Sequence, residues 1–214
     1  MISPNLLPRL LAGLARGLPD AVMAGFLAIL WVKPQWLWPT ALKTGLLVVM
    51  VEAFLMHATA LIGGLLLSAR KNQGPTWEIV TVGTLAYLGF IGTIAWDFRE
   101  WWPLLAVAWL LASKLRLLAR PVTDVPTKEH MQTVWQLGAM TYMAALFLAL
   151  MLPVPRLGLV RPVVAAAEIP GSFAWITKPH AAIALGVIYF SVLALAKSMQ
   201  WRWNTETEHD GEPA

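Results

Sequence analysis

The sequence predicts an all-α integral membrane protein, a bundle of about six transmembrane helices, and three observations lead to this prediction. Hydrophobic residues make up 58% of the 214 residues, and the mean hydropathy is +0.63. Charged residues make up only 13%, whereas soluble domains carry about 25%. Several apolar segments approach the roughly 20 residues that an α-helix needs to cross a hydrocarbon core about 30 Å thick. These segments and their connections use nearly all of the chain, which predicts one polytopic transmembrane domain over residues 1–203.

Six apolar segments, separated by clusters of proline and glycine, are predicted to be the spans. They lie at about residues 19–32, 40–69, 77–96, 101–119, 130–152 and 179–200. Residues 5–17 carry leucines and two arginines at helical spacing, so they either form an interfacial helix or extend the first span. Residues 153–178 are rich in proline, valine and alanine, which favours an interfacial connection over a re-entrant segment. Residues 204–214 are acidic and are predicted to form a disordered cytoplasmic tail.

The distribution of basic residues predicts the orientation of the bundle. If both termini, the second connection and the fourth connection share one side, that side carries ten lysines and arginines and the other side carries six. The ten are Arg9, Arg16, Arg70, Lys71, Lys114, Arg116, Arg120, Lys128, Lys197 and Arg202, and the six are Lys33, Lys43, Arg99, Arg156, Arg161 and Lys178. Because cytoplasmic connections carry the excess of basic residues, both termini are predicted to be cytoplasmic and the protein is predicted to be a multi-pass protein of the cell inner membrane.

Glu52 and His57 lie near the middle of the second predicted span and are the strongest functional clue in the chain. An ionisable residue at bilayer depth is unfavourable by roughly 2.5–3.5 kcal/mol on insertion scales, so its retention needs a reason. On a helix the two side chains are roughly 140° apart, with an axial separation of about 7.5 Å. They are therefore not expected to hydrogen-bond to each other. They lie at the two edges of a face of small and polar residues, which lets another helix approach closely.

Polar side chains on other spans are expected to lie near this pair. Gln136 and Tyr142 are on the fifth predicted span and Tyr87 is on the third. Such groups find no water in lipid and should point inward. A glutamate that exchanges a proton and a histidine that titrates near neutrality would form a proton relay or a cation site. The alternative is that both groups only hydrogen-bond between helices.

Three functions remain open at this stage. The first is a membrane protein that binds or conducts a small ion, proton or solute at the Glu52 and His57 site. The second is a non-catalytic accessory or assembly subunit of a larger membrane complex. The third is a membrane-embedded, metal-dependent enzyme with Glu52 and His57 as metal ligands, although only His57 among the histidines is predicted at mid-depth. Metalloprotease, serine hydrolase and nucleotide-binding motifs are absent from the sequence, so enzymatic activity is not favoured and no catalytic residue is assigned.

Composition limits the partners and cofactors. The chain has no cysteine, which excludes disulfides and thiolate metal sites, and no cofactor is implied. The net charge of +4 is explained by membrane topology, so no nucleic-acid partner is expected. Lys114, Arg116 and Arg120 follow the fourth span and are predicted to contact anionic lipid headgroups. A homo-oligomer or a partner in a membrane complex is also expected.

Overall fold

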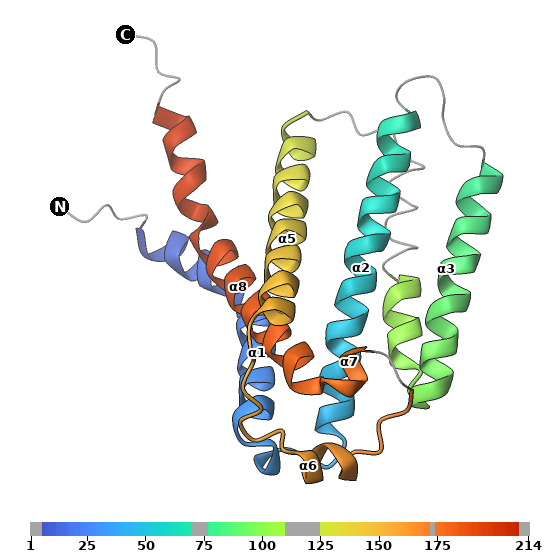
Figure 1. Ribbon diagram of the computed structural model, residues 1–214. Helices are drawn as coiled ribbons and strands as arrows, with labels where there is room; N and C mark the ends of the chain where they lie inside the picture. Colours follow the sequence, from blue (N-terminus) through green and yellow to red (C-terminus); the bar gives the residue numbers. More distant parts are fainter. Residues whose placement is uncertain (1–5, 70–76, 110–124, 172–173, 210–214) are drawn as a thin grey trace.

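The computed structural model describes residues 6–69, 77–109, 125–171 and 174–209 (Figure 1). Within these ranges every regular element is a helix and no strand occurs, which confirms the all-α prediction. The elements in chain order are α1 (Leu6–Val32), the 3-10 helix η1 (Pro34–Trp36), α2 (Ala41–Ala69), α3 (Trp77–Phe98), α5 (Val125–Met151), α6 (Arg161–Ala166), α7 (Ala174–Thr177) and α8 (Pro179–His209). Residues 102–109 are also helical.

Two helical segments of the described chain are long and apolar enough to cross a membrane by length and composition. They are Leu11–Val32 in α1 and Pro179–Met199 in α8, and Gln136–Met151 in α5 is a shorter apolar helix. The structure therefore supports a helical protein with two candidate spans, and the six-span bundle stays a prediction. Of the fourth predicted span, only the part up to residue 109 lies within the described residues.

The N-terminal segment is part of the first long helix. α1 is continuous from Leu6 to Val32 and contains Pro19, so residues 6–17 extend the first predicted span. The first turns of α1 are inclined to the rest of the helix (Figure 1). A proline inside a helix removes one backbone hydrogen bond and clashes with the preceding turn, which explains a bend near Pro19.

The last helix is longer than the sequence analysis predicts. α8 continues to His209, so residues 204–209 of the predicted disordered tail are helical. No proline or glycine interrupts the chain between Gly186 and Gly211, and residues of ordinary helix propensity such as threonine and glutamate can continue a helix that is already formed. Residues 210–214 lie outside the described residues.

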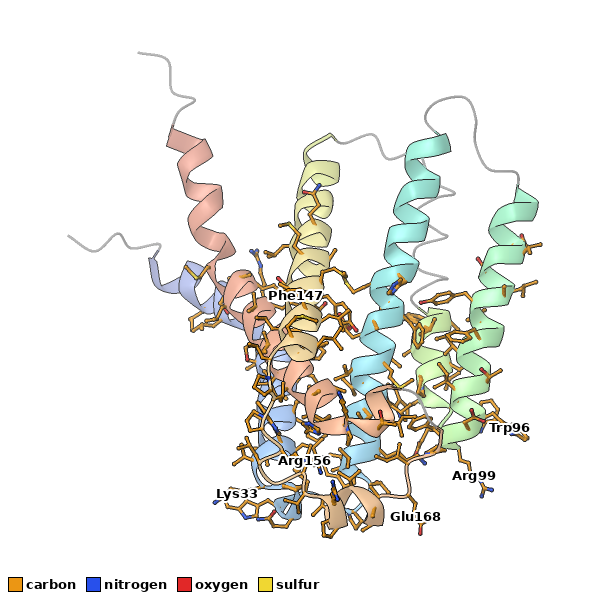
Figure 2. The ribbon with its side chains drawn as sticks, in the orientation of Figure 1. Lys33, Trp96, Arg99, Phe147, Arg156 and Glu168 are labelled. Carbon is orange, nitrogen blue, oxygen red and sulfur yellow. The ribbon has the colours of Figure 1, made fainter. Side chains whose placement is uncertain are left out.

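The connection between α5 and α8 covers one end of the bundle. It contains the short helices α6 and α7, and α6 lies across the lower helix ends in Figure 1. The interfacial position predicted for residues 153–178 stays a prediction. Lys33, Arg99 and Glu168 lie at this same end (Figure 2).

Helix α8 is the centre of the packing. It packs along α1, and it also contacts α2 and α5. The larger hydrophobic core joins these four helices and includes Leu27, Leu30, Leu46, Leu185 and Tyr189. A second core joins α2, α3 and residues 102–109 through Leu47, Val51, Ile91, Phe98 and Val107.

Glycines permit the close approach of α8 to its neighbours. A Cβ atom on Gly17 of α1 would lie 2.5 Å from the carbonyl oxygen of Ala194 and would also clash with Ser198 Oγ. A Cβ atom on Gly186 of α8 would lie 2.6 Å from Leu27 and 2.7 Å from Val49. These contacts are shorter than van der Waals distances. At Gly17 the close atom is backbone, so the α1–α8 crossing requires glycine there, whereas a Cβ atom at position 186 would require the side chains of Leu27 and Val49 to move.

The Gly17 contact gives a test of this packing. Gly17→Ala should lower the free energy of unfolding by about 1–3 kcal/mol, because the added methyl group overpacks the α1–α8 contact. Gly25→Ala in the same helix is the matched control, since a Cβ atom there has no neighbour within 4 Å. The control should be neutral or slightly stabilising, because alanine is favoured over glycine in a helix. Thermal unfolding of both variants in detergent measures the difference, and equal stabilities would contradict the α1–α8 contact.

Candidate functional site

The carboxylate of Glu52 lies between α2 and α8 and accepts a hydrogen bond from Tyr189. The distance from Tyr189 Oη to Glu52 Oε1 is 2.6 Å. Met56, one turn further along α2, places its Sδ atom 3.6 Å from the same hydroxyl. Tyr189 is only 2% exposed. Glu52 therefore projects into the interior of the bundle, where one tyrosine hydroxyl is its hydrogen-bond donor among the described residues.

Helix α5 closes the site with Tyr142 and Gly138. The Tyr142 ring meets the Tyr189 ring edge to face, with 5.4 Å between the ring centroids. The Tyr142 hydroxyl is buried and has no hydrogen-bond partner in the part of the chain that the structure describes. Gly138 faces Met56, because a Cβ atom there would lie 3.4 Å from Met56 Cε and 3.9 Å from Tyr189 Oη. A buried hydroxyl without a partner is unfavourable by about 1–3 kcal/mol, so this position suits a bound water or ion.

An ion pair between α1 and α8 lies next to this cluster. Lys197 Nζ is 2.7 Å from Asp20 Oδ2. Asp20 is 8% exposed and is the buried charged residue of the described chain. Both members of the pair lie within electrostatic range of Glu52. The α1, α2 and α8 group thus brings together two carboxylates and one partly exposed ammonium group.

His57 is not part of this cluster. Its side chain is exposed, and its Nδ1 atom lies 2.7 Å from the carbonyl oxygen of Ala53 in its own helix. A carbonyl oxygen only accepts hydrogen bonds, so Nδ1 carries the proton and donates. The expected separation of Glu52 and His57 on the helix is thus found: the carboxylate projects toward Tyr189, and the imidazole is exposed.

The other predicted site residues divide between two places. Tyr142 lies in the Glu52 cluster, as expected. The hydroxyl of Tyr87 in α3 donates a hydrogen bond to the carbonyl oxygen of Phe54, on a different face of α2. The rings of Phe54 and Tyr87 pack edge to face. The side chain of Gln136 is exposed. The structure therefore brings together Glu52 and Tyr142, and it places Tyr87 and Gln136 elsewhere.

Tyr189 is the residue of the Glu52 cluster that the sequence analysis misses. The buried face of α8 includes Ala182, Leu185, Gly186, Tyr189 and Leu193, at spacings of three and four residues. Lys197 continues this spacing one turn later. A tyrosine aligned with a glycine and a lysine on one helix face is the signal that could have indicated an inward-pointing hydroxyl.

The metal and lipid predictions have different outcomes. Among the residues whose side chains the structure describes, no three histidine, aspartate or glutamate side chains come together as metal ligands. Glu52 and His57, the predicted metal ligands, have the separate partners given above. Lys114, Arg116 and Arg120, predicted to contact anionic lipid, lie outside the described residues.

Comparisons with known proteins do not identify a relative. No protein-family model, no curated protein and no solved structure matches this chain.

The two tyrosines of the cluster should differ in their effect on stability. Tyr189→Phe removes the hydrogen-bond donor of a buried carboxylate and should lower the free energy of unfolding by about 1–3 kcal/mol. Tyr142→Phe removes a hydroxyl that has no partner in the described chain, so it should change stability little. Thermal unfolding of the two variants in detergent provides the comparison. A larger loss for Tyr142→Phe would contradict the hydrogen-bond assignment.

The ion pair of Asp20 and Lys197 predicts strongly non-additive substitutions. Asp20→Leu or Lys197→Met alone leaves one charge without its partner, whereas the double variant leaves none. The coupling free energy of the double-mutant cycle should therefore be about 1 kcal/mol or more. Unfolding of the wild type, both single variants and the double variant measures it. Additive effects on the free energy of unfolding would show that the Asp20–Lys197 interaction does not stabilise the fold.

Proposed function

We propose that this chain is a multi-pass inner-membrane protein that binds and passes a proton, or a small cation in its place, at Glu52. The observation that carries the proposal is the Glu52 carboxylate inside the helical bundle, held by the hydroxyl of Tyr189 at 2.6 Å. An ionised carboxylate in a low-dielectric interior needs a compensating charge. A proton or a cation supplies that compensation, and its arrival and departure would be the transport step.

The exposed surface supports a lipid environment. Large apolar side chains are exposed along the outer faces of several helices, where a water-soluble protein would carry charged residues. They include Leu14, Leu18 and Val22 in α1, Val82 and Leu85 in α3, and Met143, Phe147 and Leu150 in α5. α2 has 29 residues, so at 1.5 Å per residue it is about 43 Å long. This length exceeds the hydrocarbon core of about 30 Å.

The arrangement of the helix ends supports the proposed topology. The end of α1, the start of α2 and the end of α3 lie at the lower end of the bundle in Figure 1, together with the start of α8. Trp31 and Trp96 lie in these helix ends, and Trp36 and Trp101 lie in the adjoining connections, as expected for an aromatic belt at a membrane interface. α1 begins and α8 ends toward the opposite side (Figure 1). In the proposed topology that opposite side is cytoplasmic.

Polar groups beside Glu52 supply the first steps of a path for the ion. The unpartnered hydroxyl of Tyr142 lies against the ring of Tyr189, and a water bound there would extend the hydrogen-bond chain from Glu52 toward α5. In the other direction, Asp20 and Lys197 lie within electrostatic range of Glu52, near the bend of α1. Glu52 would accept the ion, Tyr189 would orient the carboxylate, and Tyr142 would hold the water.

Flux through proteoliposomes tests this function. A potassium diffusion potential should drive proton entry, reported by a trapped pH-sensitive dye, into vesicles that contain the wild type. Glu52→Gln should reduce this flux to the rate of empty vesicles, because the amide cannot take up a proton at neutral pH. Glu168→Gln is the matched control, since Glu168 is exposed at the end of the bundle, and it should retain the flux.

The negative outcome is equally informative. Equal flux in wild-type and Glu52→Gln vesicles, with both proteins folded, would contradict the proposal for protons. The same comparison with sodium or potassium ions inside the vesicles would then test the cation. Failure of both would leave the accessory-subunit interpretation, which predicts a stoichiometric partner on purification at native expression levels.

A further inference from the structure

A second polar site lies at the end of the bundle, away from Glu52. A cleft of about 270 Å³ opens where the α5–α8 connection meets the start of α8. Its polar lining consists of Arg156, Arg161, Thr177 and His180, and Leu159 and Val164 contribute apolar walls. The cleft is smaller than the 300–1,000 Å³ typical of pockets for drug-sized ligands, so it suits a small ligand or one end of a larger one.

The segment that carries Arg156 is fixed to α1. The indole Nε1 of Trp31 donates to the carbonyl oxygen of Pro155 at 2.9 Å, and the backbone N–H of Gly158 donates to the carbonyl oxygen of Trp31 at 2.9 Å. Gly158 lies so close to α1 that a Cβ atom would be 2.5 Å from the carbonyl oxygen of Val32. These contacts hold the backbone of the Arg156 turn in place before any ligand arrives.

The cleft concentrates positive charge without a carboxylate. Arg156 and Arg161 form no ion pair with any residue that the structure describes, and no aspartate or glutamate is among the lining residues. Arg156 and Lys178 lie within electrostatic range of His180. The positive end of the α8 helix dipole points toward the same place, because Pro179 and His180 begin the helix and line the cleft.

We propose that this cleft binds a phosphoryl group, either of a free phosphate or of a lipid headgroup. The planar fork of arginine matches the oxygens of phosphate with two parallel hydrogen bonds, and Arg156 and Arg161 supply two such forks. The imidazole of His180 adds a hydrogen-bond donor, and the start of α8 adds positive potential. The apolar walls of Leu159 and Val164 would contact the organic part of a phosphate ester.

The position of the cleft explains why either source is available. It lies at the end of the bundle that carries Lys33, Arg99 and Glu168 (Figure 2), where a membrane would present its headgroups. Soluble phosphate reaches the same end from the aqueous phase. The shared chemistry is the phosphoryl anion, and the experiment separates its two sources.

Binding to the full-length chain tests the site. Equilibrium dialysis of radiolabelled inorganic phosphate against the protein in neutral detergent measures the free anion. Native mass spectrometry, after incorporation into phosphatidylcholine vesicles with or without phosphatidylglycerol, measures retained anionic lipid. The Arg156→Gln/Arg161→Gln variant should bind phosphate or retain phosphatidylglycerol about tenfold or more weakly, because both forks are lost. The Lys33→Gln/Arg99→Gln variant removes the same charge from the same end and should behave as the wild type.

Each outcome decides a specific point. If the Arg156 and Arg161 variant loses phosphate binding and the control variant keeps it, the site binds a soluble anion. Loss of phosphatidylglycerol alone supports it with a lipid headgroup. Equal losses in both double variants would show nonspecific charge attraction and overturn the proposal, as would full binding in the Arg156 and Arg161 variant. The binding measurement does not depend on ion flux, so its result is independent of the function proposed for Glu52.

Discussion

The close packing of α8 against α1 and α2 is the constraint on which the rest of this structure depends. In the proposed membrane setting, helices gain little from hydrophobic burial, so they associate through van der Waals contact and through polar groups that have no other partner. Gly17 and Gly186 let the backbones approach until side chains interlock across the contact. Only at that separation can Tyr189 reach Glu52 and Lys197 reach Asp20. Both polar contacts therefore depend on the close approach that the glycines permit. Substitutions that separate α8 from α1 would disturb the two contacts together.

The same helix supplies a residue to the cleft, to the Glu52 cluster and to the ion pair with Asp20. His180 lines the cleft, Tyr189 holds Glu52, and Lys197 pairs with Asp20. At 1.5 Å per residue, Tyr189 is about 13 Å from His180 and about 12 Å from Lys197 along the axis. The three sites thus follow one another along α8. A rigid helix would transmit a shift at one end to the others, since its backbone hydrogen bonds are satisfied internally and resist local stretching.

The sequence predicts the helices well and the site only in part. Apolar runs and proline clusters indicate α2 and α3 to within two residues, because both signals act locally along the chain. Glu52 stands out because a charged group within an apolar run is unfavourable in itself. Tyr189 does not stand out, since a tyrosine in an apolar helix is ordinary and its importance comes from a hydrogen bond to a residue 137 positions away. His57 lies apart from the Glu52 cluster: its ring donates to the carbonyl oxygen of Ala53 in its own helix, and no sequence pattern indicates that local hydrogen bond.

The two polar contacts of α8 differ in charge, and this difference supports the function proposed for Glu52. Asp20 and Lys197 neutralise each other at 2.7 Å, so their pair is complete without a further partner. Tyr189 gives Glu52 a hydrogen bond but no opposite charge, and Lys197 is already committed to Asp20. An interior of low dielectric disfavours an unmatched carboxylate far more than a matched pair. Interhelical attachment alone would be achieved better by glutamine, which would accept the same hydrogen bond from Tyr189 without a charge. A carboxyl group at this position is useful where the charge itself is to be neutralised and restored, which is what binding and release of a proton or cation accomplish.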